Sequence, residues 1–208
     1  MDFQIGYRAL TAPVVSSLCK LVNSKKIPVL VGLCGRSRAG KTTVAHAIVR
    51  VLMEQGIDCL HVRLDNWIVP AANREPNSSP EARNRVDIMP DLVRALRAGK
   101  CVRAPGYNAA TRGPDCALTY DAAGKSVIVL DGIFAGHSSI RAMLDFVIFA
   151  ATPPELNRAR FFAFYRWKGF DEGAIEAIWR KRSIDEWSAV DAQGAAADFI
   201  LTSGSGQP

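Results

Sequence analysis

The sequence lacks the marks of several classes of protein. It holds no uninterrupted apolar run near the roughly 20 residues needed to cross a bilayer, so we expect no membrane-spanning segment. Its five cysteines form no C-x-x-C pair and no Cys/His cluster with zinc-site spacing, which is typical of reduced thiols in the cytoplasm. Internal repeats and long linkers are also missing. We therefore expect one domain over residues 1–208, with residues 1–26 as an N-terminal helical extension.

The basic residues do not gather in a tail or block. Lysine and arginine total 26 against 20 aspartates and glutamates, which gives a formal net charge of +6. Only residues 158–182 are clearly enriched, with seven basic side chains that could be solvated helix faces or could meet a phosphorylated ligand. A nucleic-acid-binding protein would need a clustered basic face with exposed aromatic side chains. We expect a small-molecule partner and neither nucleic acid nor membrane, and a homo-oligomer stays open.

Short apolar segments rich in β-branched residues alternate with segments of helical periodicity. The short segments are typical of buried parallel strands, and the periodic ones of amphipathic helices. The expected strands are 29–35, 59–64, 126–134, 145–151 and 198–202. The expected helices are 10–22, 44–56, 80–98 (which Pro90 could break), 154–168 and 171–190. This alternation predicts a three-layer α/β fold with a five-stranded parallel sheet.

Residues 35–42 read GRSRAGKT and fit the phosphate-binding pattern G-x-x-x-x-G-K-[ST] (Walker A) at every fixed position. Gly35 and Gly40 allow a tight turn in which backbone N–H groups converge on phosphate oxygens, and the following helix directs its positive end at the same anion. Lys41 would reach the β and γ phosphates, and Thr42 would ligate Mg²⁺. A chance glycine turn is disfavoured because a buried strand precedes the pattern and a helix follows it. The candidate nucleotide-binding residues here are Gly35, Arg36, Ser37, Arg38, Ala39, Gly40, Lys41, Thr42 and Thr43.

Two acidic residues follow predicted strands, at the edge of the sheet where ligands of parallel sheets bind. Asp131 ends the apolar run VIVLD and could organise Mg²⁺, or it could simply start a turn. Asp65 follows the run CLHVRL and could take the proton from an acceptor hydroxyl, with a helix or turn cap as an equal alternative. His46 and His61 are interpreted as packing residues.

These motifs come in the order seen in uridine kinases and, more broadly, in the uridine kinase and phosphoribulokinase group of P-loop small-molecule kinases. The motifs are the phosphate loop at 35–42, LDNW at 64–67, G-K-x-V-x-x-P-x-Y at 99–107 and VIVLDGIF at 127–134. The sequence resembles this group over roughly residues 27–202. The resemblance implies a P-loop NTPase fold with a helical lid, and the use of ATP and Mg²⁺.

The resemblance also implies roles for individual residues. Asp65 would be the base and would also approach Mg²⁺, Asp131 would be a metal partner, and Tyr107 would help to hold the acceptor. A basic helical lid, residues 155–182, would close over the ATP phosphates and exclude water. Its candidate phosphate contacts are Arg158, Arg160, Arg166 and Lys168. The aromatic side chains of the same segment are interpreted as core anchors of the lid: Phe161, Phe162 and Phe164.

The acceptor pocket is where the sequence departs from the uridine kinase pattern. The segment YNAATRGPD, which begins at Tyr107, holds no histidine, whereas uridine kinases carry one there that contacts the pyrimidine. Arg83, Arg85 and Asp87 lie on the helix in the region where nucleoside-using relatives hold the sugar hydroxyls. Asp87 is the favoured one of the three because a carboxylate can accept two hydrogen bonds from a vicinal diol, although exposed helix charges are an equal alternative. Arg112 could meet an anionic acceptor or a base carbonyl, or could be a solvated loop arginine. Arg38, inside the phosphate loop, could add charge against the phosphates or point outward.

The expected activity is ATP-dependent phosphorylation of a hydroxyl on a small molecule. A nucleoside such as uridine or cytidine is the leading acceptor, and a sugar phosphate, a vitamin precursor or another alcohol is the alternative. A nucleotide-dependent switch or ATPase is less favoured, because the sequence offers no clear water-positioning residue or switch loops. Asp65 separates these classes, since only a kinase needs this carboxylate to face the γ-phosphate across an acceptor cavity.

Overall fold

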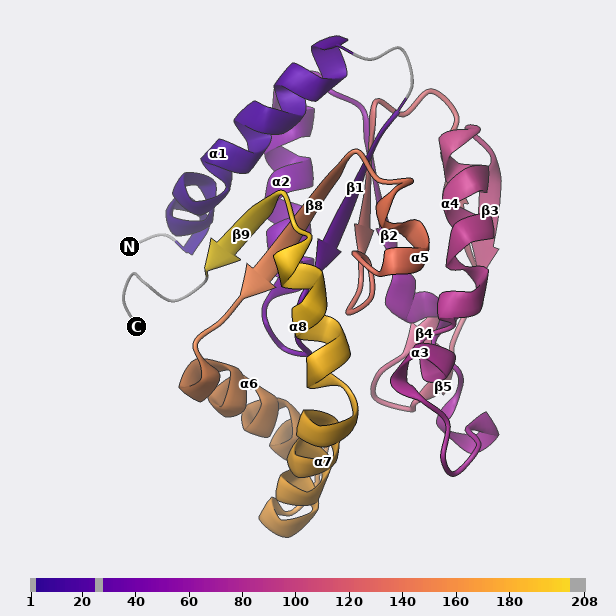
Figure 1. The fold of residues 1–208 in the computed structure, drawn as a ribbon, viewed down its shortest axis with the longest axis vertical. Coiled ribbons are helices and arrows are strands. Elements are labelled where there is room, and N and C mark those ends of the chain that lie inside the picture. The colour runs from indigo at the N-terminus through magenta and orange to yellow at the C-terminus, as the bar shows by residue number, and fades with distance from the viewer. Residues whose placement is uncertain (1–2, 25–27, 203–208) are drawn as a thin grey trace.

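The computed structural model describes residues 3–24 and 28–202 and contains the expected five-stranded parallel sheet (Figure 1). The strand order is β2-β7-β1-β8-β9, with every neighbouring pair parallel. The strands are β1 (Val29–Cys34), β2 (Cys59–Arg63), β7 (Val127–Asp131), β8 (Phe146–Ala151) and β9 (Phe199–Thr202). The prediction of an α/β fold with five core strands is therefore confirmed.

The central strands are apolar along their whole length because both faces of the sheet are covered. Every residue of β1 and β7 is buried, and Val31 of β1 is in register with Val129 of β7 on one side and Phe146 of β8 on the other. A strand buried on both faces reads as a continuous apolar run. All of these strands end at the same edge of the sheet, which therefore becomes the place for polar side chains.

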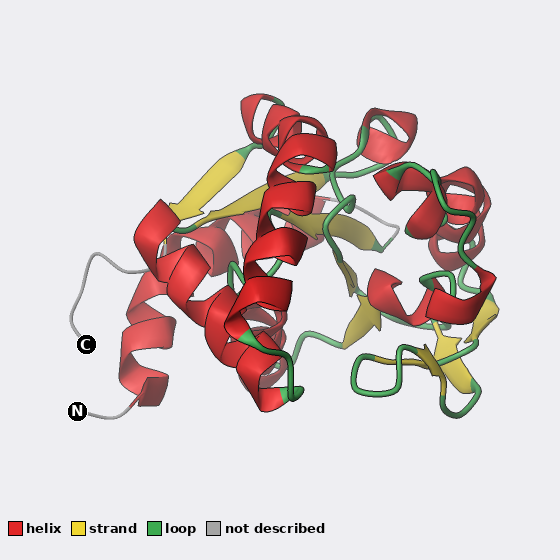
Figure 2. Cartoon of the chain, turned by 90° about the horizontal axis from the view of Figure 1, so that it is seen from below, coloured by secondary structure: helices red, strands yellow, loops and turns green. Residues whose placement is uncertain are grey.

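Helices form a layer on each face of the sheet, as the view from below in Figure 2 shows. On one face α1 and α2 pack side by side, with Leu18 and Ile48 fully buried. On the other face α4, α5 and α8 contribute Leu96, Ile140 and Val190 to a second core. None of the helices within the described residues is long and apolar enough to cross a membrane. The helices of the two layers are α1 (Phe3–Ser24), α2 (Lys41–Glu54), α4 (Met89–Arg97), α5 (Ser138–Arg141) and α8 (Trp187–Ala195).

A helical hairpin lies beyond the carboxyl ends of the strands, at the bottom of Figure 1. It consists of α6 (Pro154–Trp167) and α7 (Glu172–Asp185), within the region expected to be a lid. The hairpin has a small core of its own, in which Phe161, Phe162 and Ile175 are buried. Two of the three phenylalanines interpreted as anchors are therefore core residues, whereas Phe164 is only half-buried.

Several expected elements have other bounds in the structure; the helices expected over 10–22 and 44–56 are α1 (Phe3–Ser24) and α2 (Lys41–Glu54). The strand expected over 126–134 ends at Asp131. The helix expected over 171–190 is divided between α7 and α8 at Glu186. The helix expected over 80–98 is interrupted at Arg85, whose φ of 54° is left-handed, and not at Pro90. Pro90 lies in the first turn of α4, where a missing N–H leaves no helical hydrogen bond unmade.

The segment 101–121 folds into two small antiparallel sheets that the sequence did not predict. The strand pairs are β3 (Cys101–Ala104) with β6 (Leu118–Asp121), and β4 (Tyr107–Asn108) with β5 (Gly113–Pro114). Their residues are mostly half-exposed, so the strong apolar pattern of the central strands is absent here. The short helices between β2 and α4 are η1 (Leu64–Trp67), η2 (Ala71–Asn73), α3 (Pro80–Arg83) and η3 (Val86–Ile88).

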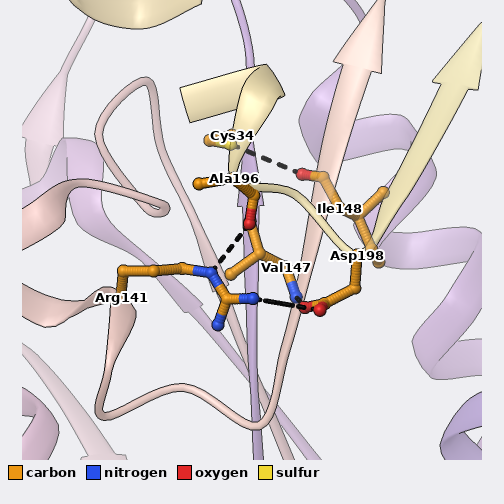
Figure 3. A network of polar contacts seen from close by, with 6 residues as sticks. All are labelled: Cys34, Arg141, Val147, Ile148, Ala196 and Asp198. Carbon is orange, nitrogen blue, oxygen red and sulfur yellow. Dashed lines mark hydrogen bonds and ion pairs between the residues drawn. The ribbon is translucent and has the colours of Figure 1, made fainter. Parts of the chain in front are cut away.

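One carboxylate, that of Asp198, fixes the last strand of the sheet, β9, in place (Figure 3). Asp198 accepts hydrogen bonds from the backbone N–H of Val147 at 2.7 Å and from the guanidinium of Arg141 at 2.9 Å. The same guanidinium donates to the carbonyl of Ala196 at 2.9 Å. Because these groups belong to α5, β8 and the turn before β9, the bonds hold the last strand in register against the sheet.

Candidate active site

The phosphate loop joins β1 to α2, and its backbone requires glycine at both ends. Gly35 has a φ of 137°, and a Cβ at this position would lie 2.5 Å from the carbonyl oxygen of Ala150. Gly40 has a φ of 90° and turns the chain into the first residue of α2, Lys41. The Lys41 ammonium is nearly buried and donates to the carbonyl of Arg36 at 3.0 Å, so it lies inside the loop. The loop thus combines a helix N-terminus with a cation, an arrangement suited to phosphate.

Asp131 lies beside this loop, with its carboxylate held by two neighbours. The Thr42 hydroxyl donates to Asp131 Oδ2 at 2.7 Å, and His61 Nε2 lies 3.4 Å from the same oxygen. Burial opposes ionisation of Asp131, but the contacts with His61, Lys41 and Thr42 outweigh it and hold its pKa below the usual value. The interpretation of His61 as a packing residue is incomplete, because its side chain lies against the carboxylate of Asp131. The sequence could have indicated this contact, since His61 lies on a predicted strand next to the one that ends at Asp131.

These side chains fit a magnesium ion bound together with a nucleotide. Hydroxyl and carboxylate oxygens are the ligands that Mg²⁺ prefers, and the ion usually takes only one or two carboxylates and completes its shell with water and phosphate. Within residues 3–24 and 28–202 no group of three acidic, histidine or cysteine side chains could hold a metal alone. Thr42 and Asp131 would therefore hold the ion, with Asp65 within reach of the same region.

Asp65 lies in η1, immediately after β2, and its position is fixed by the rest of that turn. The side chain of Asn66 donates to the Tyr120 hydroxyl at 2.5 Å, which ties η1 to β6. Burial and the negative charge of Asp131 raise the pKa of Asp65, against the opposing effect of Lys41 and the nearby arginines. A carboxylate with a raised pKa is a better proton acceptor than an ordinary aspartate, which suits a general base.

Two adjoining cavities open at this edge of the sheet, and Asp65 lines both. The phosphate-loop cavity, about 600 Å³, is lined by Gly40, Lys41, Thr42 and Thr43 among others. The arginine-rich cavity, about 440 Å³, extends from Asp65 toward the segment 68–84 and α7. The wall common to both includes Ser37, Arg38, Arg63, Asp65, Tyr107 and Phe164. A ligand on the phosphate loop would thus be separated from a ligand in the second cavity by Asp65.

The two arginines of the phosphate loop have different surroundings. Arg36 pairs with Asp191 of α8, with Nε to Oδ1 at 2.9 Å, and its guanidinium lies 4.1 Å from the ring centre of Trp187. It therefore connects the loop to α8. Arg38 has a φ of 66°, lines both cavities and stacks at 3.3 Å on the ring of Phe164. Of the two, Arg38 is the one whose charge faces the cavities.

The four basic residues expected on the lid divide into two pairs. Arg160 lines the phosphate-loop cavity, and Lys168 lines the arginine-rich cavity and donates to the carbonyl of Ala109. Arg158 pairs with Glu176 and Arg166 with Glu172, and neither lines a cavity. Residues two positions apart on a helix point to nearly opposite faces, so Arg158 and Arg160 face different sides of α6, and so do Arg166 and Lys168 at its end.

The expected acceptor contacts divide in the same way. Tyr107 and Arg112 line the arginine-rich cavity. Arg85 and Asp87 form an ion pair with each other at 2.9 Å, are largely exposed and line neither cavity. The left-handed backbone of Arg85 breaks the expected helix and turns this pair away. Sequence reasoning overlooked Arg74, which donates to the Val69 carbonyl at 2.9 Å and to the Tyr107 hydroxyl at 3.3 Å, because nothing in its loop marks it.

The chain is similar in sequence and in fold to several known proteins. The chain is 31% identical over 144 residues to uridine-cytidine kinase A of Dictyostelium discoideum, covering 65% of this chain and 28% of that protein. It is 27% identical to uridine kinase of Staphylococcus aureus, covering 65% of this chain and 67% of that protein. Its fold is similar to that of a possible uridine kinase from Bacillus stearothermophilus, with a TM-score of 0.61, 22% identity and coverage of 90% and 96%.

The chain spans little more than a quarter of the length of the Dictyostelium relative and two thirds of the staphylococcal one. A family model matches nearly all of the sheet and the lid, over residues 30–207. That match is far longer than the phosphate loop, and includes Asp65, Tyr107 and Asp131. The chain therefore belongs to the phosphoribulokinase/uridine kinase family.

Proposed function

We propose that this chain transfers the γ-phosphoryl group of ATP to a hydroxyl of a small molecule. The observation that carries the proposal is the position of Asp65, which lines the phosphate-loop cavity and the arginine-rich cavity at once. A nucleotide switch or an ATPase has no need for a second cavity behind such a carboxylate. The family to which the chain belongs supports kinase activity of the P-loop type.

In this proposal each side chain has a role that its surroundings support. Asp65 accepts the proton of the acceptor hydroxyl as the oxygen attacks the γ-phosphorus, and ADP leaves with the electron pair of the broken bond. Lys41 and Arg160 stabilise negative charge on the phosphates, and Arg38 faces the same space. When bound at Thr42 and Asp131, Mg²⁺ would neutralise phosphate charge. The lid α6–α7 would exclude water from the reaction.

The finer proposal concerns the acceptor. A nucleoside such as uridine or cytidine is supported by the names of the two relatives and by Tyr107, which lines the arginine-rich cavity. The alternative is a sugar phosphate, a vitamin precursor or another alcohol, and it is supported by the absence of histidine from the segment 107–115. ADP release measured with Mg·ATP and a panel of nucleosides, sugar phosphates, pantothenate and glycerate distinguishes the two.

The test of the catalytic proposal is Asp65→Asn. Removing the base should lower kcat by a factor on the order of 10² to 10⁴, while the affinity for nucleotide changes little because asparagine keeps the shape of the side chain. Asp91→Asn is the matched control, since Asp91 is an exposed residue of α4 paired with Arg94. Unchanged turnover of the Asp65 variant would remove this residue from the role of base.

A further inference from the structure

The arginine-rich cavity carries far more positive than negative charge. Eight basic side chains line it, against three acidic ones: Asp65, Glu75 and Glu186. Glu186 lies 3.6 Å from Arg182, and Asp65 has the catalytic role proposed above. Most of the basic groups are therefore not neutralised by the cavity itself. Positive charge held together in a cleft raises the local concentration of anions.

Four of the arginines line this cavity and not the phosphate-loop cavity. One of them, Arg182, is paired with Glu186, which leaves three: Arg74, Arg83 and Arg112. Arg74 and Arg83 donate to carbonyl oxygens, of Val69 at 2.9 Å and of Ser78 at 3.0 Å, and Arg74 also donates to a hydroxyl. Within the described residues no carboxylate lies at ion-pair distance from any of the three. None of the three lines the phosphate-loop cavity.

Arg74 lies close enough to Arg112 and Arg83 to be affected by the positive charge of each. Burial lowers the pKa of Arg74, and the positive charges of Arg112 and Arg83 lower it further. Such a cluster is unfavourable in the free protein, and an anion that entered it would relieve the repulsion. The planar guanidinium also suits carboxylate and phosphate oxygens, which it can bind with two parallel hydrogen bonds.

A buried hydroxyl, that of Ser78, also indicates a ligand in the arginine-rich cavity. Ser78 lines the arginine-rich cavity, and its Oγ is buried without a hydrogen-bond partner among the described residues. Buried polar atoms nearly always have a partner, so an orphan beside a cavity indicates a missing ligand or water. The backbone carbonyl of the same residue accepts from Arg83, so this hydroxyl belongs to the arginine cluster.

We propose that the acceptor carries an anionic group, a phosphate monoester or a carboxylate, which Arg74, Arg83 and Arg112 bind while its hydroxyl lies at Asp65. This inference rests on the proposed kinase function and narrows its substrate class. A neutral nucleoside in this cavity would give the three guanidinium groups no counter-charge. Of the acceptors considered above, sugar phosphates and hydroxy acids therefore fit the cavity better than uridine or cytidine.

The anion site is tested first by binding, independently of turnover. The chain is saturated with Mg·AMP-PNP, which occupies the phosphate loop, and is titrated with inorganic phosphate in a calorimeter. We expect saturable binding that weakens on the order of tenfold to a hundredfold in Arg74→Gln and in Arg112→Gln. Arg94→Gln, an exposed arginine of α4 paired with Asp91, should bind as the unmodified chain does. Absent binding, or equal binding by all variants, would overturn the inference.

Of these variants, Arg112→Gln is the one expected to fold normally, because the Arg112 side chain is exposed and its loss removes no hydrogen bond of the described residues. Weaker phosphate binding by this variant therefore reports on the site and not on misfolding.

The second test uses matched acceptors that share a hydroxyl and differ in charge: ribulose 5-phosphate with ribulose, glycerate with glycerol, and pantothenate with panthenol. Stimulation of ADP release by a charged member alone, with a raised KM for that acceptor and an unchanged KM for ATP in the arginine variants, supports the proposal. Stimulation by uridine or by neutral members alone overturns it and leaves the kinase function standing. Phosphate binding without any stimulated turnover supports the anion site and contradicts the kinase function.

Discussion

Arg38 and Asp65 face the same wall between the two cavities, and their charges affect each other. Burial and Asp131 raise the pKa of Asp65, whereas the cations Lys41, Arg63 and Arg38 lower it. As the proposed base, Asp65 must be ionised, so we expect activity to fall as the pH drops through its pKa. The acid limb of kcat/KM reports this pKa in the free enzyme.

Arg38→Gln removes one of the charges that favour the ionised form of Asp65. The pKa of Asp65 should rise further, and the acid limb of kcat/KM should move to higher pH. The measurement is a pH profile of ADP release, in which the position of the limb is read separately from its height. Arg180→Gln, an exposed lid arginine that lines neither cavity, should leave the limb in place. A limb that stays, or that moves to lower pH, would contradict the assignment of Asp65 as base.

The lid, α6 and α7, is held together by a small hydrophobic core of its own. Phe161 is almost fully buried, with its ring centre 4.6 Å from that of Tyr165 and 5.0 Å from that of Trp179. This core is separate from the two cores that cover the faces of the sheet. Elements with few buried apolar side chains open more readily than the rest of a protein.

Phe161→Ala should therefore loosen the lid and spare the sheet. The deleted ring costs about 3–5 kcal/mol in a well-packed core, which is more than so small a core can absorb. Hydrogen exchange should accelerate in α6 and α7 and stay slow in β1 and β7. Ile184→Ala, with a side chain that is 74% exposed, is the control and should change neither. Faster exchange throughout the sheet would mean that lid and sheet unfold as one unit.

The elements that sequence could predict are those whose burial leaves a pattern. The runs VLVGLC and VIVLD are buried on both faces, and both strands lie where expected. The break at Arg85 could not be predicted, because left-handed backbone is usually signalled by glycine or asparagine and here falls on arginine. The strands β3 to β6 are short and half-exposed, so tertiary packing decides them more than their own residues do.

At the scale of the whole molecule, the cysteines report on global unfolding. Cys34 lies in β1 and Cys59 in β2, and burial raises the pKa of each thiol to about 12. The thiolate is the reactive form, and at pH 8 almost none of either thiol is ionised. Cys101 and Cys116 are exposed and should react at once with iodoacetamide.

We expect Cys34 and Cys59 to react only when the sheet unfolds. Labelling read by mass spectrometry across a urea series should show one common transition for both, at the midpoint given by circular dichroism. Mg·AMP-PNP should move that transition to higher urea, because it binds only the folded state. Labelling of Cys34 or Cys59 before the transition would show that the sheet opens locally.

The sequence predicts the part of the site that is contiguous in the chain and not the part that is assembled from distant segments. The phosphate loop is one contiguous segment, so its residues could be predicted together. The arginine-rich cavity is assembled from the loop 68–84, the segment around Arg112 and helix α7, which are far apart in the chain. None of these arginines is unusual in its own neighbourhood, and only the fold brings their charges together. The sequence favours Asp87 over Arg83 because a carboxylate can accept two hydrogen bonds from a diol, whereas in the structure Arg83 lines the cavity and Asp87 does not.

The common wall at Asp65 also has a consequence for the order in which substrates bind and products leave in the proposed reaction. The two cavities meet there, so in the proposed reaction an acceptor hydroxyl in one would attack the γ-phosphate in the other directly, with no residue storing the phosphoryl group between two half-reactions. Both substrates must then be present together before either product forms. For the proposed kinase, we therefore expect a sequential mechanism through a ternary complex.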